Sequence, residues 1–275
     1  MTRRNCTEFD KISRALFNLG HQDITDFENE IVSRPRGRKG SIKVAEQAFM
    51  KVVTGLSLSN LLEVGGNDGR HSRRFLEETS TTVHTFEPNV FAIPFFAEIV
   101  SNERFRFNPF GLSDRAGLET FNILTGLQGR DFEPVNGCSS FAGLDRPDAN
   151  YRQVAAIMQR GDTYVSKLSI EGAFGLWVDV EGYAKFVLEG FGDRLANAAV
   201  VLCETEVLDL YSTGANADDV VRSLQAAGHE IVFRDFQNFG QFNILSVHQS
   251  VAAEARALIR PILQPFMDGL KIQPD

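Results

Sequence analysis

The sequence predicts an α/β fold: a mixed, mostly parallel sheet with an N-terminal helical extension. Three observations support this fold class. Residues 60–89 follow the pattern strand, glycine turn, helix, strand and acid, which begins many doubly wound nucleotide-binding sheets. Apolar strand segments then alternate with helical segments along the rest of the chain. Two strand segments flanking a turn near residue 240 close the sheet as an antiparallel C-terminal strand pair.

The composition indicates a globular protein with a sizeable core, because 43% of the 275 residues are hydrophobic and 23 are phenylalanine. A net charge of −8 argues against a nucleic-acid partner. No apolar run approaches the roughly 20 residues of a membrane span, and no apolar stretch follows the basic residues near the start. Cys6, Cys138 and Cys203 have neither metal-ligand spacing nor an even count. We therefore expect a cytoplasmic protein with reduced cysteines and no membrane partner.

Residues 1–56 are expected to form a helical extension or lid, and residues 57–275 the cofactor-binding domain. Ser41 can cap the second of two helices in the extension. The cationic segment 34–40 between them is interpreted as a solvated connector in preference to an anion site. By analogy with enzymes that have this core, we expect the helical pair to cover the site as a lid or to pack in a homodimer. Apolar residues recur at helical spacing at Ile12, Leu16 and Leu19, and again at Val44, Ala48, Val52 and Val53.

The segment 60–64 predicts a buried strand that runs into glycines at positions 65, 66 and 69. Residues 70–78 have helical composition, and 83–86 form a second strand that ends at Glu87. Glycines let the backbone approach a ligand closely. A carboxylate beyond the second strand can accept hydrogen bonds from both hydroxyls of a ribose.

Two cofactor classes use this layout, the dinucleotides and S-adenosylmethionine. A dinucleotide site favours G-x-G-x-x-G, so that a pyrophosphate lies on a helix N-terminus, but Asn67 occupies the third position of that pattern here. Acidic Glu63 and Asp68 crowd the turn, which suits the ammonium and sulfonium groups of S-adenosylmethionine and repels a pyrophosphate. The sequence therefore favours S-adenosylmethionine over a dinucleotide, and either over a turn that serves only the fold.

The middle of the chain predicts shorter elements. Asn108-Pro109-Phe110 is interpreted as a turn, after which the backbone of Leu112 to Asp114 can bracket an adenine. The long segment 125–150 is interpreted as a substrate-facing loop. The expected elements are a helix over 90–100, strands over 104–107 and 118–124, a helix over 151–160 and a strand over 163–170.

The segment 176–181 alternates as a strand whose end directs Asp179 and Glu181 into a cleft. Another buried strand, over 199–206, also ends in acids. The remaining expected elements are helices over 183–190 and 217–227, strands over 229–234 and 242–247, and a closing helix over 252–268 broken at Pro261.

Five motifs in this order resemble the FkbM-type methyltransferases, over roughly residues 58–248. They are Glu63-Val64-Gly65-Gly66-Asn67-Asp68-Gly69, Phe86-Glu87-Pro88-Asn89, Gly111-Leu112-Ser113-Asp114, Val178-Asp179-Val180-Glu181-Gly182, and Glu204. The resemblance implies a class I, Rossmann-like methyltransferase that O-methylates a hydroxyl of a sugar or secondary metabolite. The cofactor-binding residues it implies are Glu63, Gly65, Gly66, Asn67, Asp68, Gly69, Glu87, Pro88, Asn89, Leu112, Ser113 and Asp179.

The chain departs from this family where chemistry is expected. Trp177 stands at the family's lysine, Ala184 at its last glutamate, and Leu168-Ser169 at its usual Leu-Asp pair. Asp179 and then Glu181 are the expected catalytic residues, as base or acceptor-orienting groups, although Glu181 can equally be a helix cap. These acids can also bind a divalent cation, which we do not predict from the sequence. Trp177 is expected to pack in the core, and His84 to face the sheet surface.

Three functions follow from these expectations. The favoured one is a methyltransferase acting on a small-molecule or glycan acceptor. The alternatives are an NAD-dependent oxidoreductase and a non-catalytic relative that only binds the cofactor.

Overall fold

The computed structural model describes residues 3, 5–34 and 37–270, and within them two sheets are present. The main sheet has seven strands in the order β10-β11-β9-β8-β1-β2-β3. Its strands are parallel except β11, which runs antiparallel to both of its neighbours. The strands of this sheet are β1 (Asn60–Val64), β2 (Thr82–Phe86), β3 (Phe105–Asn108), β8 (Phe174–Val178), β9 (Ala198–Glu206), β10 (His229–Arg234) and β11 (Gln241–His248).

The strand order reverses direction between β1 and β8, which makes this the switch point of a doubly wound sheet. The predicted fold class, a mixed, mostly parallel Rossmann-like sheet with an antiparallel C-terminal strand pair, is therefore confirmed.

The helices are α1 (Thr7–Phe17), α2 (Ile24–Ser33), α3 (Gly37–Gly55), α4 (Arg70–Glu78), α5 (Gly161–Lys167), α6 (Ala184–Phe191), α7 (Ala217–Ala226) and α8 (Ala252–Leu270), with short 3₁₀ helices η1 (Ile93–Phe96), η2 (Gly192–Asn197) and η3 (Gln249–Val251).

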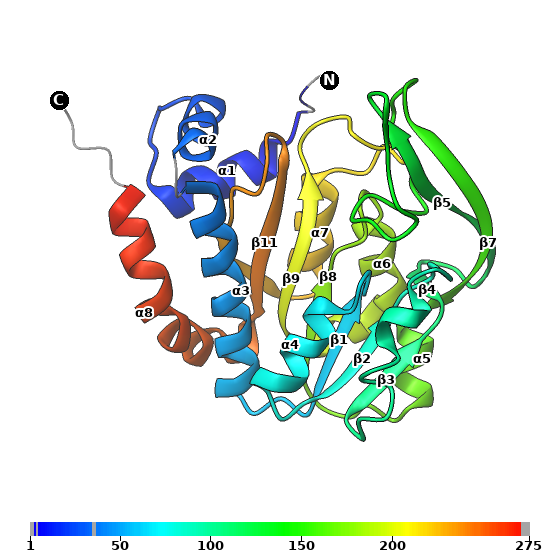
Figure 1. The fold of residues 1–275 in the computed structure, drawn as a ribbon. Helices are drawn as coiled ribbons and strands as arrows, with labels where there is room; N and C mark the ends of the chain where they lie inside the picture. Colours follow the sequence, from blue (N-terminus) through cyan, green and yellow to red (C-terminus); the bar gives the residue numbers. More distant parts are fainter. Residues whose placement is uncertain (1–2, 4, 35–36, 271–275) are drawn as a thin grey trace.

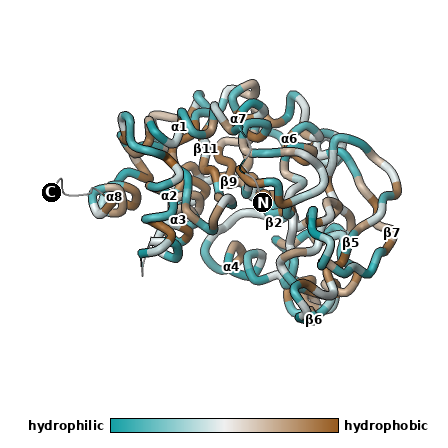
Figure 2. The backbone as a smooth tube through the Cα atoms, turned by 90° about the horizontal axis from the view of Figure 1, so that it is seen from above, coloured by the Kyte–Doolittle hydropathy of each residue, from teal (hydrophilic) through white to brown (hydrophobic). Residues whose placement is uncertain are grey.

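Two apolar layers enclose the main sheet. Helices α3, α4 and α8 cover one face, and Phe49, Phe75 and Ile259 from these helices share one apolar cluster with the buried Trp177. Helices α5, α6 and α7 cover the other face. The central strands are therefore apolar, as the brown colour of β9 and β11 in the interior shows in Figure 2. No helix among the described residues is long and apolar enough to cross a membrane.

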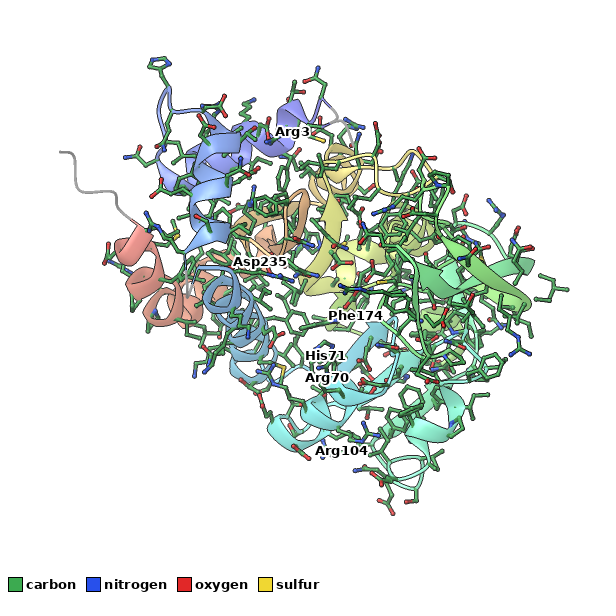
Figure 3. All side chains as sticks on the ribbon, turned by 45° about the horizontal axis from the view of Figure 1, so that its top comes forward. Arg3, Arg70, His71, Arg104, Phe174 and Asp235 are labelled. Carbon is green, nitrogen blue, oxygen red and sulfur yellow. The ribbon has the colours of Figure 1, made fainter. Side chains whose placement is uncertain are left out.

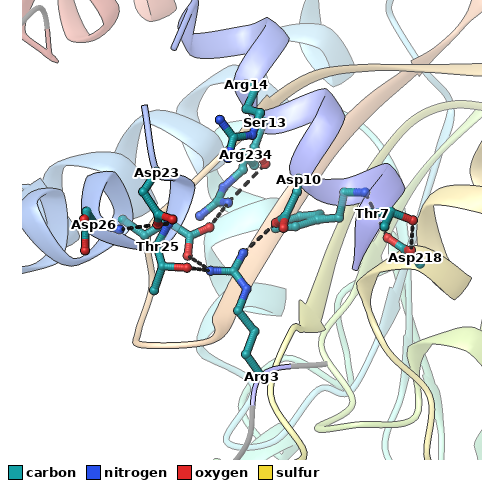
Figure 4. A network of polar contacts seen from close by, with 12 residues as sticks. Arg3, Thr7, Asp10, Ser13, Arg14, Asp23, Thr25, Asp26, Asp218 and Arg234 are labelled. Atoms are coloured by element: carbon teal, nitrogen blue, oxygen red, sulfur yellow. Dashed lines mark hydrogen bonds and ion pairs between the residues drawn. The ribbon is translucent and has the colours of Figure 1, made fainter. Parts of the chain in front are cut away.

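A fully buried arginine fixes the N-terminal helices to the sheet. Arg234, at the end of β10, forms an ion pair with Glu28 of α2 at 2.7 Å and donates a hydrogen bond to Ser13 of α1. Its guanidinium lies over the rings of Phe9, Phe236 and Phe242, with centroid distances of 3.7–4.7 Å. Arg3 binds the other carboxylate oxygen of Glu28 (Figure 4).

The predicted division after residue 56 stays a prediction, but α3 is part of the layer that covers the sheet and not a detached segment. Ser41 lies inside α3 and accepts a hydrogen bond from the amide of Phe236, so its predicted role as a helix cap is wrong. Helix α2 was missed. Of the cationic segment 34–40, Pro35 and Arg36 lie outside the described residues, and residues 37–40 begin α3.

The second sheet is a long hairpin that projects beside the main sheet (Figure 1). Strands β5 and β7 pair antiparallel along most of their lengths, and β4 and β6 flank them. The predicted strand over 118–124 is confirmed within β5. The second sheet consists of β4 (Gly111–Ser113), β5 (Gly117–Leu127), β6 (Arg130–Asp131) and β7 (Asn150–Arg160).

The predicted helix over 151–160 is wrong, because this segment is strand β7. Its Ala, Gln and Met residues favour a helix, but Ala156 and Met158 are buried while Ala155 and Ile157 are exposed. This period of two suits pairing with β5, and the pairing outweighs local propensity.

Three further expectations are corrected. Residues 163–170 form helix α5 and the turn after it, not a strand, with Tyr164 and Val165 packed in the core. The helix over 90–100 is reduced to the single 3₁₀ turn η1, which begins around Pro94. Helix α8 continues through Pro261 and Pro265, both on its exposed side, where the carbonyl groups left without a helical partner can bind water.

Candidate active site

A cavity of about 250 Å³ opens where β1, β2, β8 and β9 end, beside the switch point. Ligands bind at this edge in doubly wound sheets. Residues of the hairpin sheet and its loop also line this cavity. The lining residues include Val64, Gly65, Gly66, Asn67, Asp68, Arg70 and His71 after β1, Glu87, Pro88 and Asn89 after β2, Gly111, Leu112, Phe121, Asn136, Gly137, Ser139, Ser140 and Phe141 from the hairpin side, and Asp179, Val180, Glu181, Tyr183, Glu204 and Gln237.

The glycine turn after β1 brings its backbone against the end of β8. Gly65 has a φ of +95°, and a Cβ there would lie 1.7 Å from the carbonyl oxygen of Asp179. A Cβ on Gly66 would lie 2.4 Å from Thr85. Asn67 has a φ of 43°, in the left-handed region that few residues with a side chain adopt and in which asparagine is tolerated better than most. The turn thus requires glycine at positions 65 and 66, and the amides of both glycines donate hydrogen bonds to the carbonyl of Phe86 at the end of β2.

Glu87 lines the cavity and holds the two loops beside it, which follow β1 and β2. Its two carboxylate oxygens accept hydrogen bonds from the amides of Asn67 at 2.6 Å and Asn89 at 2.7 Å. Burial raises the pKa of Glu87 to about 7, and these amide bonds act in the opposite direction. A carboxylate has about four acceptor positions, so positions remain for the hydroxyls of a ligand.

Glu63 does not share this cavity, which corrects the expectation that the carboxylates of residues 63, 68 and 87 surround one ligand. It is 0% exposed beneath the glycine turn. Thr85 donates to its Oε2 at 2.6 Å, and Ser72 donates to the same oxygen. Asp68 and Glu87 do line the cavity. Alternation along β1 accounts for this, since Glu63 is a strand residue and not part of the turn.

Because burial raises the pKa of Glu63 from 4.5 to about 8, folding favours its protonated form. The contribution of Glu63 to the free energy of unfolding is therefore fully present below about pH 4.5, and it is lost as the pH rises towards 8. We expect the stability of Glu63→Gln relative to wild type to increase by up to about 1.4 kcal/mol per pH unit in this window and to level off above it. Urea denaturation of both proteins between pH 5 and 9 measures this difference; a difference independent of pH would show that Glu63 is ionised in the fold.

The other candidate residues of the turn and hairpin lie at different depths. Pro88, Asn89 and Leu112 line the cavity. Ser113 is buried behind it, within hydrogen-bond distance of the hydroxyl of Tyr183 at 3.2 Å. Gly69 packs against Phe96 at the start of α4. The Asn108-Pro109-Phe110 turn is confirmed between β3 and β4.

Three acids meet on the β8–β9 side of the cavity. Asp179 follows β8, Glu181 lies two residues further on, and Glu204 is in β9. One carboxylate oxygen from each lies within 4.8 Å of the others. Burial raises the pKa of all three, and the neighbouring acids raise those of Glu181 and Glu204 further. Such pKa shifts in a cleft are typical of functional acids.

Glu181 is not a helix cap. Helix α6 begins three residues later, after Tyr183, and the carboxylate of Glu181 instead accepts hydrogen bonds from Tyr211 and from Gln241 at 3.2 Å. Its φ of 51° is again unfavourable for a residue with a side chain. A residue of the β9–α7 connection and the first residue of β11 thus hold this acid in the cavity lining.

The sequence interpretation missed two basic residues of this site, Arg70 and His71, which begin α4 (Figure 3). The ring of His71 lies 4.7 Å from that of Trp177. Burial lowers the pKa of His71, while the charge of Asp179 opposes that change. Their position in the sequence could have indicated this role, because the first helical residues after such a glycine turn lie at the edge of the sheet where ligands bind.

The hairpin wall was predicted only as a substrate-facing loop over 125–150, and individual residues were not predicted. Ser140 ties this loop to the acidic segment by donating to the carbonyls of Val180 and Glu181 at 2.9 and 2.7 Å. Phe141 packs against Phe121 and Tyr183, with centroids 5.0 and 5.6 Å apart. Phe141 of this loop therefore joins Phe121 and Tyr183 in an aromatic part of the cavity lining.

Trp177 and His84 lie away from the cavity. Trp177 is 4% exposed between Phe49 and Phe75, so its predicted core packing is confirmed. His84 is buried beside Tyr164 and Asn60, to which its ring nitrogens are hydrogen-bonded. The three cysteines are free.

The fold and this cavity define a Rossmann-like protein with a candidate ligand site at the switch point, and acidic side chains line that site. No family model matches the chain. The chain is similar to the 2-O-methyltransferase NoeI of Sinorhizobium fredii (strain NBRC 101917 / NGR234), with 26% identity over 163 residues that cover 55% of this chain and 65% of that relative. It thus spans slightly less than two thirds of the relative's length.

A solved structure is also similar, the Burkholderia thailandensis 1,6-didemethyltoxoflavin-N1-methyltransferase with bound 1,6-didemethyltoxoflavin and S-adenosylhomocysteine. The identity is 14% and the TM-score 0.36, over 90% of this chain and 91% of that chain. A likeness at this TM-score supports no conclusion about the present chain.

Proposed function

We propose that this chain is an S-adenosylmethionine-dependent methyltransferase of the FkbM type that methylates a hydroxyl group of a sugar or secondary metabolite. The observation that carries the proposal is the acidic cavity at the switch point, with Glu87 after β2 and Asp179 after β8. Similarity to a 2-O-methyltransferase supports the same activity.

The cavity residues suit a cationic adenosyl donor better than a dinucleotide. Asp68, Glu87 and Asp179 line the space that a pyrophosphate would have to enter, and like charges would repel it. The glycine turn lets an adenosyl group approach the backbone closely, since a Cβ at Gly65 or Gly66 would displace its neighbours. Glu87 would hold the ribose hydroxyls, and Leu112 would contact the base.

The donor supplies a methyl group on a positively charged sulfur, which a nucleophile displaces in line. The chain must hold the acceptor in near-attack geometry and remove its hydroxyl proton. Asp179 is the first candidate for this base, because it lines the cavity and burial raises its pKa. Glu181 is the second, and Phe141 and Tyr183 provide a surface on which a sugar ring can stack.

Two departures from the FkbM pattern lie outside the cavity lining. Trp177 is packed among aromatic residues, and Ala184 is buried at the start of α6. Neither replacement removes a residue from the lining described here, which favours an active enzyme over a non-catalytic relative.

Glu87→Gln is expected to weaken the binding of S-adenosylhomocysteine at least about tenfold, because a charged acceptor of the ribose hydroxyls is lost. Isothermal titration of both proteins measures the change. Glu98→Gln is the matched control, since the side chain of Glu98 is 84% exposed. Failure of the wild-type protein to bind S-adenosylmethionine and S-adenosylhomocysteine, or binding of NAD in their place, would reject the proposed function.

A further inference from the structure

We propose that Asp179, Glu181 and Glu204 form a binding site for a divalent cation of the Mg²⁺ or Mn²⁺ class. The three side chains come from the ends of adjacent strands and converge on one point, with one oxygen from each within 4.8 Å of the others. Mg²⁺ and Mn²⁺ prefer carboxylate oxygens, and three carboxylates leave part of a six-coordinate shell open.

An unsatisfied carboxylate oxygen provides an independent indication of a ligand. Glu204 is only 3% exposed, and it lines the cavity. Its Oε1 accepts a hydrogen bond from Gln237, whereas its Oε2 is buried without a hydrogen-bond donor among the described residues, and the side chain lies within hydrogen-bond reach of the carboxylate of Asp179. A buried polar atom of this kind is costly unless a ligand or water satisfies it.

The neighbouring charges do not balance these acids. Within the part of the chain that the structure describes, no lysine or arginine forms an ion pair with Asp179, Glu181 or Glu204. Arg70 and His71 line the same cavity near Asp179, but among the described residues neither forms an ion pair with any of the three acids. Like-charged carboxylates this close together are unfavourable unless protons or a cation intervene. A divalent cation would neutralise two of these charges and coordinate the unpartnered oxygen.

The cation site would assist the methyl transfer proposed above, so its role in the reaction rests on the proposed function. A cation there would lie beside Asp179, where the acceptor hydroxyl must be deprotonated, and would lower the pKa of a hydroxyl bound to it. Its open positions would favour acceptors with two adjacent oxygens, such as the neighbouring hydroxyls of a sugar ring. Asp179 and Glu181 would then hold the cation and orient the acceptor.

Mn²⁺ alone, without S-adenosylmethionine, is the probe for the site. Loss of the free Mn²⁺ signal in electron paramagnetic resonance is expected to show one site per chain with a dissociation constant of about 1 mM or lower. Glu204→Gln, which keeps the side-chain shape, is expected to weaken this binding at least about tenfold. Glu230→Gln is the matched control because Glu230 lies at the surface in an exposed ion pair with Arg256, and Mn²⁺ binding of this variant should equal that of wild type.

Thermal unfolding checks that the variant folds. In EDTA, Glu204→Gln is expected to melt at or above the wild-type temperature, because a repulsive buried charge is removed; Mn²⁺ should raise the melting temperature of wild type only. Absence of Mn²⁺ binding to wild type, or equal binding to Glu204→Gln, would overturn the metal site. Titration of S-adenosylhomocysteine in EDTA tests the proposed function separately, so either proposal can fail while the other stands.

Discussion

Asp179→Asn is expected to lower the rate of methyl transfer at least about 100-fold, the lower end of the contribution of a positioned general base. The substitution keeps the size of the side chain and removes its negative charge. Asp179 is the acid that lies directly after β8, where the glycine turn meets it, so it is adjacent to both the predicted donor and the acceptor space. If the residue holds a cation, the same loss follows, because an amide is a poorer ligand.

The measurement is transfer of a labelled methyl group from S-adenosylmethionine to a panel of sugars and hydroxylated small molecules. Binding of S-adenosylhomocysteine is expected to weaken by less than about tenfold, which separates a catalytic loss from a folding defect. Asp193→Asn, at an exposed position before β9, is the control. Near wild-type turnover of Asp179→Asn would remove this residue from the mechanism.

Arg234→Ala is expected to lower the free energy of unfolding by about 3–5 kcal/mol, the usual cost of breaking a buried ion pair from one side. The variant leaves Glu28 with Arg3 as its remaining cationic partner and removes the guanidinium packed against Phe9, Phe236 and Phe242. Helices α1 and α2 should therefore separate from β10 first.

Urea denaturation measures this loss, and hydrogen exchange identifies where protection falls. Arg256→Ala is the control, because Arg256 also pairs with a glutamate but at the surface, and the expected loss there is about 0–1 kcal/mol. A loss below about 1 kcal/mol for Arg234→Ala would mean that the buried pair contributes no more than a surface pair.

The main sheet was predictable because its signals are local. Each central strand is a short apolar run that ends in glycines or acids, so β1, β2, β8 and β9 were placed within a few residues. The hairpin sheet was not predictable, because β7 depends on pairing with β5 about 30 residues earlier, and its own composition favours a helix. Helix α5 was mistaken for a strand for the complementary reason, since Thr163, Tyr164 and Val165 favour strands.

The sequence located the candidate site only where residues follow strands directly. Asp68, Glu87, Asp179 and Glu181 all line the cavity, as their positions after strands indicate. Glu63 is the exception, because alternation within β1 turns its side chain beneath the loop. His71, Phe141 and Gln237 enter the cavity from a helix and from loops, whose course depends on tertiary contacts and has no short-range pattern.

The cavity has walls from two sheets whose strands do not pair with each other, which has a practical consequence. The glycine turn and Glu87 belong to the seven-stranded sheet, whereas Phe121 and Phe141 belong to the hairpin and its loop. Substitutions of Phe121 and Phe141 can therefore change which molecules the cavity accommodates while the glycine turn and Glu87 keep their own contacts. A library of variants confined to this wall is the natural starting point for altering selectivity.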